Sequence, residues 1–313
     1  MRQTIWLVLL LFLFGCGAQT VTQVSSNDLK AGAFSGAAIG AFVNGMTNIT
    51  SFQSSIGRNL AVVLWYVQWP DPFPTDDANT VNANGSVPLI TWEPQIANAL
   101  GTLEAIAAGS YESYVTSFLQ AAKAWNKPLF LRFAHEMNGN WYAWDGSHNG
   151  ESGGADRYIK AWRYIYNVKN SLKADNVIMV WCPNNKNQPA VSWNAMTAYY
   201  PGDAYVDWVG MDGYNWGSGS WEAFDQVFSG AYATITALTD KPLMIGEFAC
   251  AEQGGAKAAW ISDAFNKIQT NYSRVKIFCW FNINKERDWR VSSTASAEAA
   301  VKNALQNSYF LDR

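Results

Sequence analysis

The sequence predicts a single (β/α)8 barrel, and three observations lead to that expectation. Eight apolar runs of strand length recur along the 313 residues. Each run is apolar throughout rather than alternating with polar residues, as expected of a parallel strand covered on both faces. Longer stretches with apolar residues at spacings of three and four lie between several of these runs and indicate helices with one buried side. This alternation favours a (β/α)8 barrel over the alternative, a two-domain doubly wound protein.

The expected strands cover 37–43, 60–67, 87–92, 128–134, 177–182, 206–211, 242–248 and 275–281. The expected helices cover 112–125, 156–172, 221–238 and 257–269. The first of these helices shows the spacing well, with Val115, Phe118, Ala122 and Trp125 on one side. No glycine-rich or proline-rich linker divides the chain, so one folded domain is expected over residues 30–313.

The N-terminus has the features of a secretory signal peptide over residues 1–18. A basic Arg2 precedes the apolar run from Ile5 to Phe14, and small residues including Ala18 follow it. The run is too short to span a bilayer, and no later segment approaches about 18 uninterrupted apolar residues. We therefore expect a secreted protein without a membrane span. The alternative is a lipid anchor on Cys16, since residues 13–16 also resemble a bacterial lipoprotein cleavage box.

Charge and composition point away from nucleic acid and towards a neutral ligand. The 22 basic and 25 acidic residues leave a net charge of −3, so the chain lacks the excess of positive charge that favours binding of a polyanion. The chain carries 16 Trp, 14 Tyr and 16 Phe, more rings than one core ordinarily needs. Some rings should therefore form exposed platforms, which suit the flat CH-rich faces of sugars. We expect the protein to act as a monomer.

Two glutamates follow apolar strands at positions that face each other in a barrel. Active sites of (β/α)8 barrels lie at the C-terminal ends of the strands. The fourth strand leads into His135-Glu136, and the seventh ends in Gly246-Glu247. Retaining glycoside hydrolysis uses two such carboxyl groups about 5–5.5 Å apart, one as nucleophile and one as proton donor. We expect Glu136 and Glu247 to be the catalytic pair.

Further polar and aromatic residues at the strand ends are expected to bind the sugar. They are His135, Trp141, Trp144, Trp92, Asn184, Asp212, Tyr214, Trp216 and Trp280. Tyr214 could also donate a hydrogen bond that keeps the nucleophilic carboxylate ionised.

The sequence offers no motif for a metal or a nucleotide cofactor, and none is expected. His135 and His148 are the two histidines, and HExxH and Cys/His zinc spacings are absent. The chain also lacks a GxGxxG after a strand and a P-loop, and none of the expected strands leads into a GxSxG elbow. Residues 145–156 loosely follow the spacing of a calcium loop, but Ser147 and Asp156 depart from it, so we expect a rim loop.

The stretch from Arg132 to Trp141 (RFAHEMNGNW), together with Gly246-Glu247, Asp212-Gly-Tyr214 and Trp280, resembles glycoside hydrolase family 26. The resemblance extends from about residue 30 onward. It implies a (β/α)8 barrel with Glu136 as acid/base and Glu247 as nucleophile. His135 and Tyr214 would be their hydrogen-bonding neighbours, and Trp141 and Trp280 would contact the sugars around the cleaved bond.

The resemblance leaves several substrates open. The family consists mainly of endo-β-1,4-mannanases, with some mixed-linkage β-glucanases and β-1,3-xylanases. Its mannanases often read Trp-Phe-Trp-Trp after the motif, whereas this chain reads Trp141-Tyr142-Ala143-Trp144. Mannose differs from glucose by an axial 2-hydroxyl, and His135, Asn184 and Trp280 are the candidates for a wall that recognises it.

The leading hypothesis is a retaining endo-β-1,4-mannanase without cofactor, acting on mannan, glucomannan and galactomannan. The first alternative is a mixed-linkage β-glucanase or β-1,3-xylanase with the same site. The second alternative is a non-catalytic carbohydrate-binding barrel, although a binding protein has no use for two opposed carboxylates.

Overall fold

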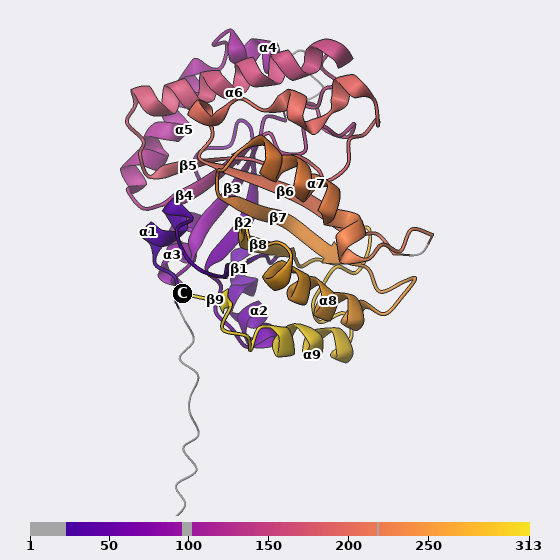
Figure 1. Ribbon diagram of the computed structural model, residues 1–313. Helices are drawn as coiled ribbons and strands as arrows, with labels where there is room; N and C mark the ends of the chain where they lie inside the picture. The colour runs from indigo at the N-terminus through magenta and orange to yellow at the C-terminus, as the bar shows by residue number, and fades with distance from the viewer. Residues whose placement is uncertain (1–22, 96–101, 218) are drawn as a thin grey trace, which may run out of the picture.

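The computed structural model describes residues 23–95, 102–217 and 219–313, which form a closed barrel of eight parallel strands surrounded by helices (Figure 1). The strands are β1 (Ala37–Phe42), β2 (Val62–Gln68), β3 (Val87–Glu93), β4 (Leu129–Phe133), β5 (Val177–Trp181), β6 (Trp208–Asn215), β7 (Leu243–Cys250) and β8 (Val275–Phe281). Each strand pairs with the next, and β1 pairs with both β2 and β8, which closes the barrel. The predicted fold class and all eight predicted strands are confirmed.

The described helices are α1 (Ser26–Ala31), α2 (Ile49–Ile56), α3 (Thr75–Ala83), α4 (Thr102–Ala107), α5 (Glu112–Trp125), α6 (Gly154–Ser171), α7 (Phe224–Leu238), α8 (Lys257–Thr270) and α9 (Ala295–Ala304). The four predicted helices correspond to α5, α6, α7 and α8. The other five were not predicted, because they span only 6 to 10 residues and give short periodic patterns.

Short elements complete the frame. The connection between β5 and β6 holds three 3-10 helices, η3 (Ser192–Asn194), η4 (Met196–Tyr199) and η5 (Asp203–Tyr205). A two-residue strand, β9 (Phe310–Leu311), pairs with β1 at the opposite end of that strand from the site. No helix in the described part of the chain has the length and apolar character needed to cross a bilayer. The predicted signal peptide over 1–18 lies outside the described residues.

The core has two parts, one inside the barrel and one between the strands and the helices. Leu64, Leu89, Phe130 and Met244 pack inside the barrel, whereas Trp65, Ile90 and Leu131 belong to the outer layer. Successive residues of a strand point to opposite faces, so each strand contributes alternate residues to each part. The last inward-facing residues of each strand therefore reach the mouth of the barrel, where the site lies.

Candidate active site

Glu136 follows β4 on a backbone that ordinary residues rarely adopt. Its φ is 51°, and that of Ala134 is 47°, both in the left-handed region. The Glu136 N–H donates to the carbonyl of Cys182 at 2.9 Å, which ties this turn to β5. Such backbone conformations are concentrated at functional sites, where the surrounding structure enforces them. Here the turn directs the Glu136 carboxyl into the mouth of the barrel.

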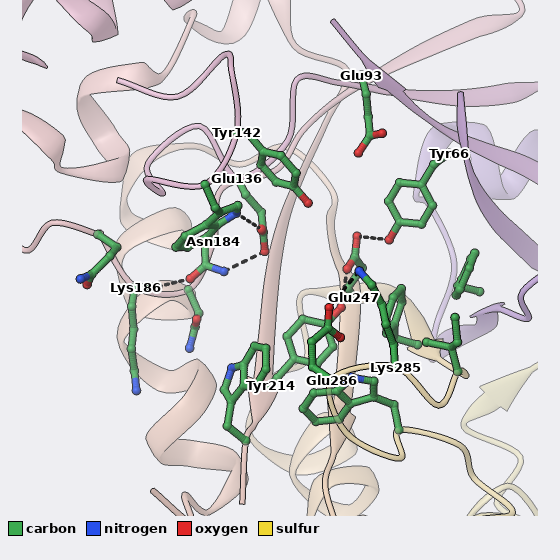
Figure 2. Close-up of a pocket in the computed structure, with 18 of the residues that line it drawn as sticks. Tyr66, Glu93, Glu136, Tyr142, Asn184, Lys186, Tyr214, Glu247, Lys285 and Glu286 are labelled. Carbon is green, nitrogen blue, oxygen red and sulfur yellow. Dashed lines mark hydrogen bonds and ion pairs between the residues drawn. The ribbon is translucent and has the colours of Figure 1, made fainter. Parts of the chain in front are cut away.

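Two side chains hold the Glu136 carboxyl from different segments. Asn184 Nδ2 donates to Oε1 at 2.7 Å, and Trp141 Nε1 donates to Oε2 at 2.9 Å. The bond from Asn184 appears in Figure 2, where Glu136 faces Glu247 across the cavity. Asn184 and Trp141 were both predicted to bind substrate; the structure shows that each also orients Glu136.

Glu247 lies on β7 where the pairing register shifts between Ile245 and Phe248. A β-bulge of this kind changes the direction of a side chain, and here Glu247 points into the cavity. The preceding Gly246 is required by close packing, because a Cβ there would lie 2.6 Å from Asp212 Oδ1 and 2.8 Å from Arg132 Nη1.

Glu247 is held by a cation and two phenols. Arg132 and Tyr214 both donate to its carboxylate, and Tyr66 donates from β2 to Oε1 at 2.6 Å. Arg132 is fully buried and also pairs with Asp212 at 2.7 Å. Because this buried guanidinium binds carboxylates on two strands, it keeps Glu247 ionised and also fixes its position.

These surroundings separate the two glutamate pKa values. Burial and the Glu247 charge raise the pKa of Glu136 to about 7. Burial alone would also raise the pKa of Glu247, but the Arg132 guanidinium and the phenols outweigh it and lower that pKa to about 2. At neutral and mildly acidic pH, one carboxyl can thus give a proton while the other is an ionised nucleophile. Widely separated pKa values are the signature of an acid and base pair.

The two glutamates share an open cavity of about 950 Å³. Its aromatic and aliphatic lining consists of Phe42, Tyr66, Trp141, Tyr142, Tyr214, Trp216, Phe281, Ile283 and Trp289. Its polar lining consists of Gln68, Glu93, Gln95, Glu136, Asn184, Asn185, Lys186, Gln188, Glu222, Glu247, Lys285 and Glu286. Trp141 and Trp216 are 45% and 43% exposed, so the predicted platforms at these two positions are available to a ligand.

Three predicted sugar platforms are wrong. Trp92 and Trp144 are fully buried and Trp280 is 2% exposed. Trp92 stacks on Phe118 of α5, and Trp280 donates Nε1 to the carbonyl of Trp289. Trp92 and Trp280 each lie one residue away from a cavity-lining position, Glu93 and Phe281, so strand alternation points their rings outward.

Trp144 lies behind the cavity wall rather than on it. Its ring stacks on Tyr142 and its Nε1 donates to the His135 carbonyl. Trp144 thus supports Tyr142, which does line the cavity.

Asp212 and His135 also do not line the cavity. Asp212 is fully buried and pairs with Arg132, and His135 is 1% exposed. His135 Nε2 lies 3.9 Å from Glu247 Oε1, and burial together with Arg132 lowers the His135 pKa to about 3. The imidazole is therefore neutral, and both residues support Glu247 from behind instead of contacting sugar.

Sequence reasoning missed several residues of the site. Tyr66 and Tyr142 line the cavity, and Arg132 holds Glu247 from within the barrel. Tyr66 lies in the middle of an apolar run, which gave no sign of function. Arg132 carried a usable signal, because a charged residue inside an otherwise apolar strand needs a buried partner.

The described residues contain one group with metal-ligand chemistry. His135, Asp212 and Glu247 offer ligand atoms within 4.8 Å of one another. The Arg132 guanidinium already pairs with both carboxylates of this group, which opposes a second cation there. In the calcium-like stretch, Asp145 accepts hydrogen bonds from Tyr142 N, His148 N and His148 Nδ1, so its carboxylate organises the loop itself.

Several known proteins resemble this chain in sequence or in fold. Residues 89–306 match glycosyl hydrolase family 26. The chain is 39% identical over 281 residues to Endoglucanase H of Acetivibrio thermocellus, covering 87% of this chain and 30% of that protein. It is 31% identical over 157 residues to mannan endo-1,4-beta-mannosidase A and B of Caldalkalibacillus mannanilyticus, covering 49% of this chain and 28% of that protein. The chain thus spans less than a third of the length of either relative.

The solved structure of the Bacillus subtilis mannanase BCman has the same fold, with a TM-score of 0.67 at 20% identity over 92% of this chain and 90% of that chain. The match to residues 89–306 covers six of the eight barrel strands and includes both glutamates together with Arg132, Asn184 and Tyr214. The chain belongs to glycosyl hydrolase family 26.

Proposed function

We propose that this protein is a retaining endo-glycosidase that cleaves a β-1,4-linked hexose polysaccharide. The observation that carries the proposal is the pair Glu136 and Glu247, which face each other across one cavity with their pKa values moved in opposite directions. A carbohydrate-binding barrel gains nothing from a buried proton donor opposite an ionised carboxylate. The exposed rings of Trp141 and Trp216 give the cavity platforms for pyranose faces.

In this proposal each glutamate has one role in each of two steps. Glu136 gives its proton to the glycosidic oxygen while a Glu247 oxygen attacks the anomeric carbon, so the leaving sugar departs with that proton. The sugar is then esterified to Glu247. Glu136, now ionised, takes a proton from water, and the water oxygen displaces Glu247 from the anomeric carbon. Tyr66, Tyr214 and Arg132 stabilise Glu247 when it is negatively charged, at the start and the end of the cycle.

We rank two polymers as the leading candidates for the substrate. We rank β-glucan first, because the relative with 39% identity over 87% of this chain is named an endoglucanase. In addition, two of the three residues predicted to recognise the axial hydroxyl of mannose, His135 and Trp280, do not reach the cavity. β-1,4-Mannan, the substrate predicted from sequence, is the second candidate, and the mannan endo-1,4-beta-mannosidase relative favours it.

A reducing-sugar assay of the purified protein tests the proposal. Barley β-glucan, carboxymethylcellulose, konjac glucomannan and locust bean gum should be compared, with Glu247→Ala as the inactive control. We expect fastest release from barley β-glucan and a β-anomer as the first product seen by NMR. Fastest release from locust bean gum would reverse the ranking. No release from any of the four polymers, together with retained binding, would favour the binding barrel.

We also propose that the protein is secreted, from the signal peptide predicted over residues 1–18, since a polysaccharide cannot cross a membrane to reach it. Mass spectrometry of the mature N-terminus in a secreting host would distinguish cleavage after Ala18 from a lipid-modified Cys16.

A further inference from the structure

A third carboxyl group, that of Glu93, lies in the same cavity and has no part in the two catalytic steps. Glu93 is the last residue of β3 and pairs in register with Gln68, the last residue of β2. It lies two residues beyond Thr91, which faces the barrel interior and accepts hydrogen bonds from Arg132. Strand alternation therefore points Glu93 inward, and Figure 2 shows its carboxyl directed into the cavity beside Tyr66.

The fold does not need the Glu93 side chain to hold its backbone. The Glu93 carbonyl accepts from Trp69 N at 2.9 Å and from Gln95 N at 2.7 Å, so the strand end is fixed by main-chain bonds. The residue is only 7% exposed, and among the described residues none forms an ion pair with its carboxyl. The side-chain amide of Gln68 is its neighbouring hydrogen-bonding group.

Burying a carboxyl group without a charged partner costs free energy that an apolar residue at the same place would avoid. The groups that face Glu93 come from several strands. Burial and the Glu247 charge raise its pKa to about 7, while Arg132, Gln68 and Lys285 act in the opposite direction. The Glu93 charge in turn helps to raise the pKa of Tyr142. Below pH 7 the group is mostly a neutral acid, with one O–H donor and one carbonyl acceptor.

A neutral acid of this kind matches the chemistry of a sugar hydroxyl, which both donates and accepts. The Glu93 carboxyl lies beside Tyr66, which donates to Glu247 (Figure 2), and the Glu247 charge helps to raise the Glu93 pKa. It therefore lies on the Glu247 side of the cavity, where the sugar that Glu247 attacks would be held. With Gln68 beside it, it offers two hydrogen-bonding side chains from adjacent strand ends.

We propose that Glu93, assisted by Gln68, is a specificity-determining residue that hydrogen-bonds a ring hydroxyl of the sugar held against Glu247 and so selects between hexoses. The inference rests on the proposed glycosidase function and adds to it Glu93 as the group that recognises the sugar. Leaving a buried polar group unpaired against the wrong epimer would lower the rate for that epimer.

Two variants of similar size separate this role from a structural one. Glu93→Gln keeps a donor and an acceptor, and Glu93→Leu removes both. We expect Glu93→Gln to keep kcat/KM within about threefold at pH 5.5, and Glu93→Leu to lower it about 10- to 100-fold on the preferred polymer. The melting temperature of Glu93→Leu should equal or exceed that of the unmodified protein, because an unpaired buried acid is gone.

A purely structural role of Glu93 would change neither the substrate selectivity nor the pH dependence of the rate, so both should be measured. The ratio of kcat/KM on gluco- and manno-oligosaccharides of equal length should change in Glu93→Leu. The activity of Glu93→Gln relative to the unmodified enzyme should rise as pH passes about 7, because the amide does not lose its donor. Glu112 is exposed on α5, and Glu112→Gln is the control for the loss of a carboxylate outside the cavity.

The outcomes distinguish this inference from the proposed function. If the unmodified enzyme cleaves a polymer but Glu93→Leu matches it in rate and selectivity, this inference alone is overturned. A uniform loss on every substrate with a lowered melting temperature would also overturn it. If the unmodified protein cleaves nothing, the proposed function fails, and the affinity of oligosaccharides for the protein and for Glu93→Leu decides the inference by calorimetry.

Discussion

The phenol of Tyr66 on β2 donates a hydrogen bond of 2.6 Å to Oε1 of Glu247 on β7. This bond favours the ionised form of Glu247 and is one reason for its low pKa. Arg132 donates to the same oxygen. Glu247 is therefore held there by two donors that lie far from it in the sequence.

Tyr66→Phe removes this bond with little change of shape. The pKa of Glu247 should rise by about one unit, since a hydrogen bond to a charged group contributes roughly 1.5 kcal/mol or more. The acidic limb of the kcat/KM profile should move to higher pH by the same amount. Tyr164→Phe is the control, because its hydroxyl has no hydrogen-bond partner among the described residues. Superimposable acidic limbs for Tyr66→Phe and the unmodified enzyme would remove Tyr66 from this role.

Small anions should separate the roles of the two glutamates. In Glu136→Ala, a substrate with a good leaving group needs no proton donor, so its first step should survive, and azide should speed the second step to give a β-glycosyl azide. Glu247→Ala should lose turnover, and azide should not restore a retained product. Product NMR checks the anomer. The opposite behaviour of the two variants would exchange their roles.

The rate should depend on pH through Glu136. Because its pKa is raised to about 7, kcat/KM on a polymer should fall as pH rises through that value and the proton donor is lost. In Glu136→Gln, assayed on an activated substrate, this basic limb should disappear. A basic limb that persists unchanged would assign it to another group.

The free energy of unfolding should also depend on pH through Glu136. The folded protein binds the Glu136 proton more tightly than the unfolded chain, so the free energy of unfolding should fall as pH rises from about 4.5 to about 7. Glu136→Gln removes this contribution and should unfold at a higher temperature than the unmodified protein at pH 8 but at a similar one at pH 5. Calorimetry at both values tests it, and an equal difference at pH 5 and pH 8 would contradict it.

Exposed and buried tryptophans should respond differently to truncation. Trp216→Ala should raise KM for polymer and leave the melting temperature nearly unchanged, because the ring is 43% exposed in the cavity. Trp280→Ala should destabilise the fold by about 3–5 kcal/mol, because it opens a buried space. Urea unfolding and initial rates measure the two effects. A stable Trp280→Ala with a raised KM would restore the platform role.

Gly246→Ala should damage both stability and activity. The new Cβ would lie 2.6 Å from Asp212 Oδ1, so the Arg132 and Asp212 pair would have to move, at a cost of about 1–3 kcal/mol. Gly230→Ala is the matched control, since nothing lies within 4 Å of its Cβ position on helix α7. That change should stabilise the protein by roughly 0.5–1 kcal/mol, as for any exposed helical glycine. Equal effects of the two changes would contradict the packing argument.

Local sequence was sufficient to predict the barrel and the positions of its two glutamates. Continuous apolar runs identified the strands because each is covered on both faces. The residues at the C-terminal ends of these runs had to gather at one rim of the barrel, which predicted that Glu136 and Glu247 lie near each other.

Only the tertiary structure decided which strand-end residues enter the cavity. Trp92 and Glu93 are neighbours, as are Trp280 and Phe281, and in each pair the second residue faces the site. A strand that is apolar on both faces does not alternate polar and apolar residues, so its sequence does not show which residues face the barrel interior. A shift of one residue would turn every side chain to the opposite face. The bulge at Gly246-Glu247 shifts this alternation again, and Gly246 packs there against Arg132 and Asp212, which lie far away along the chain.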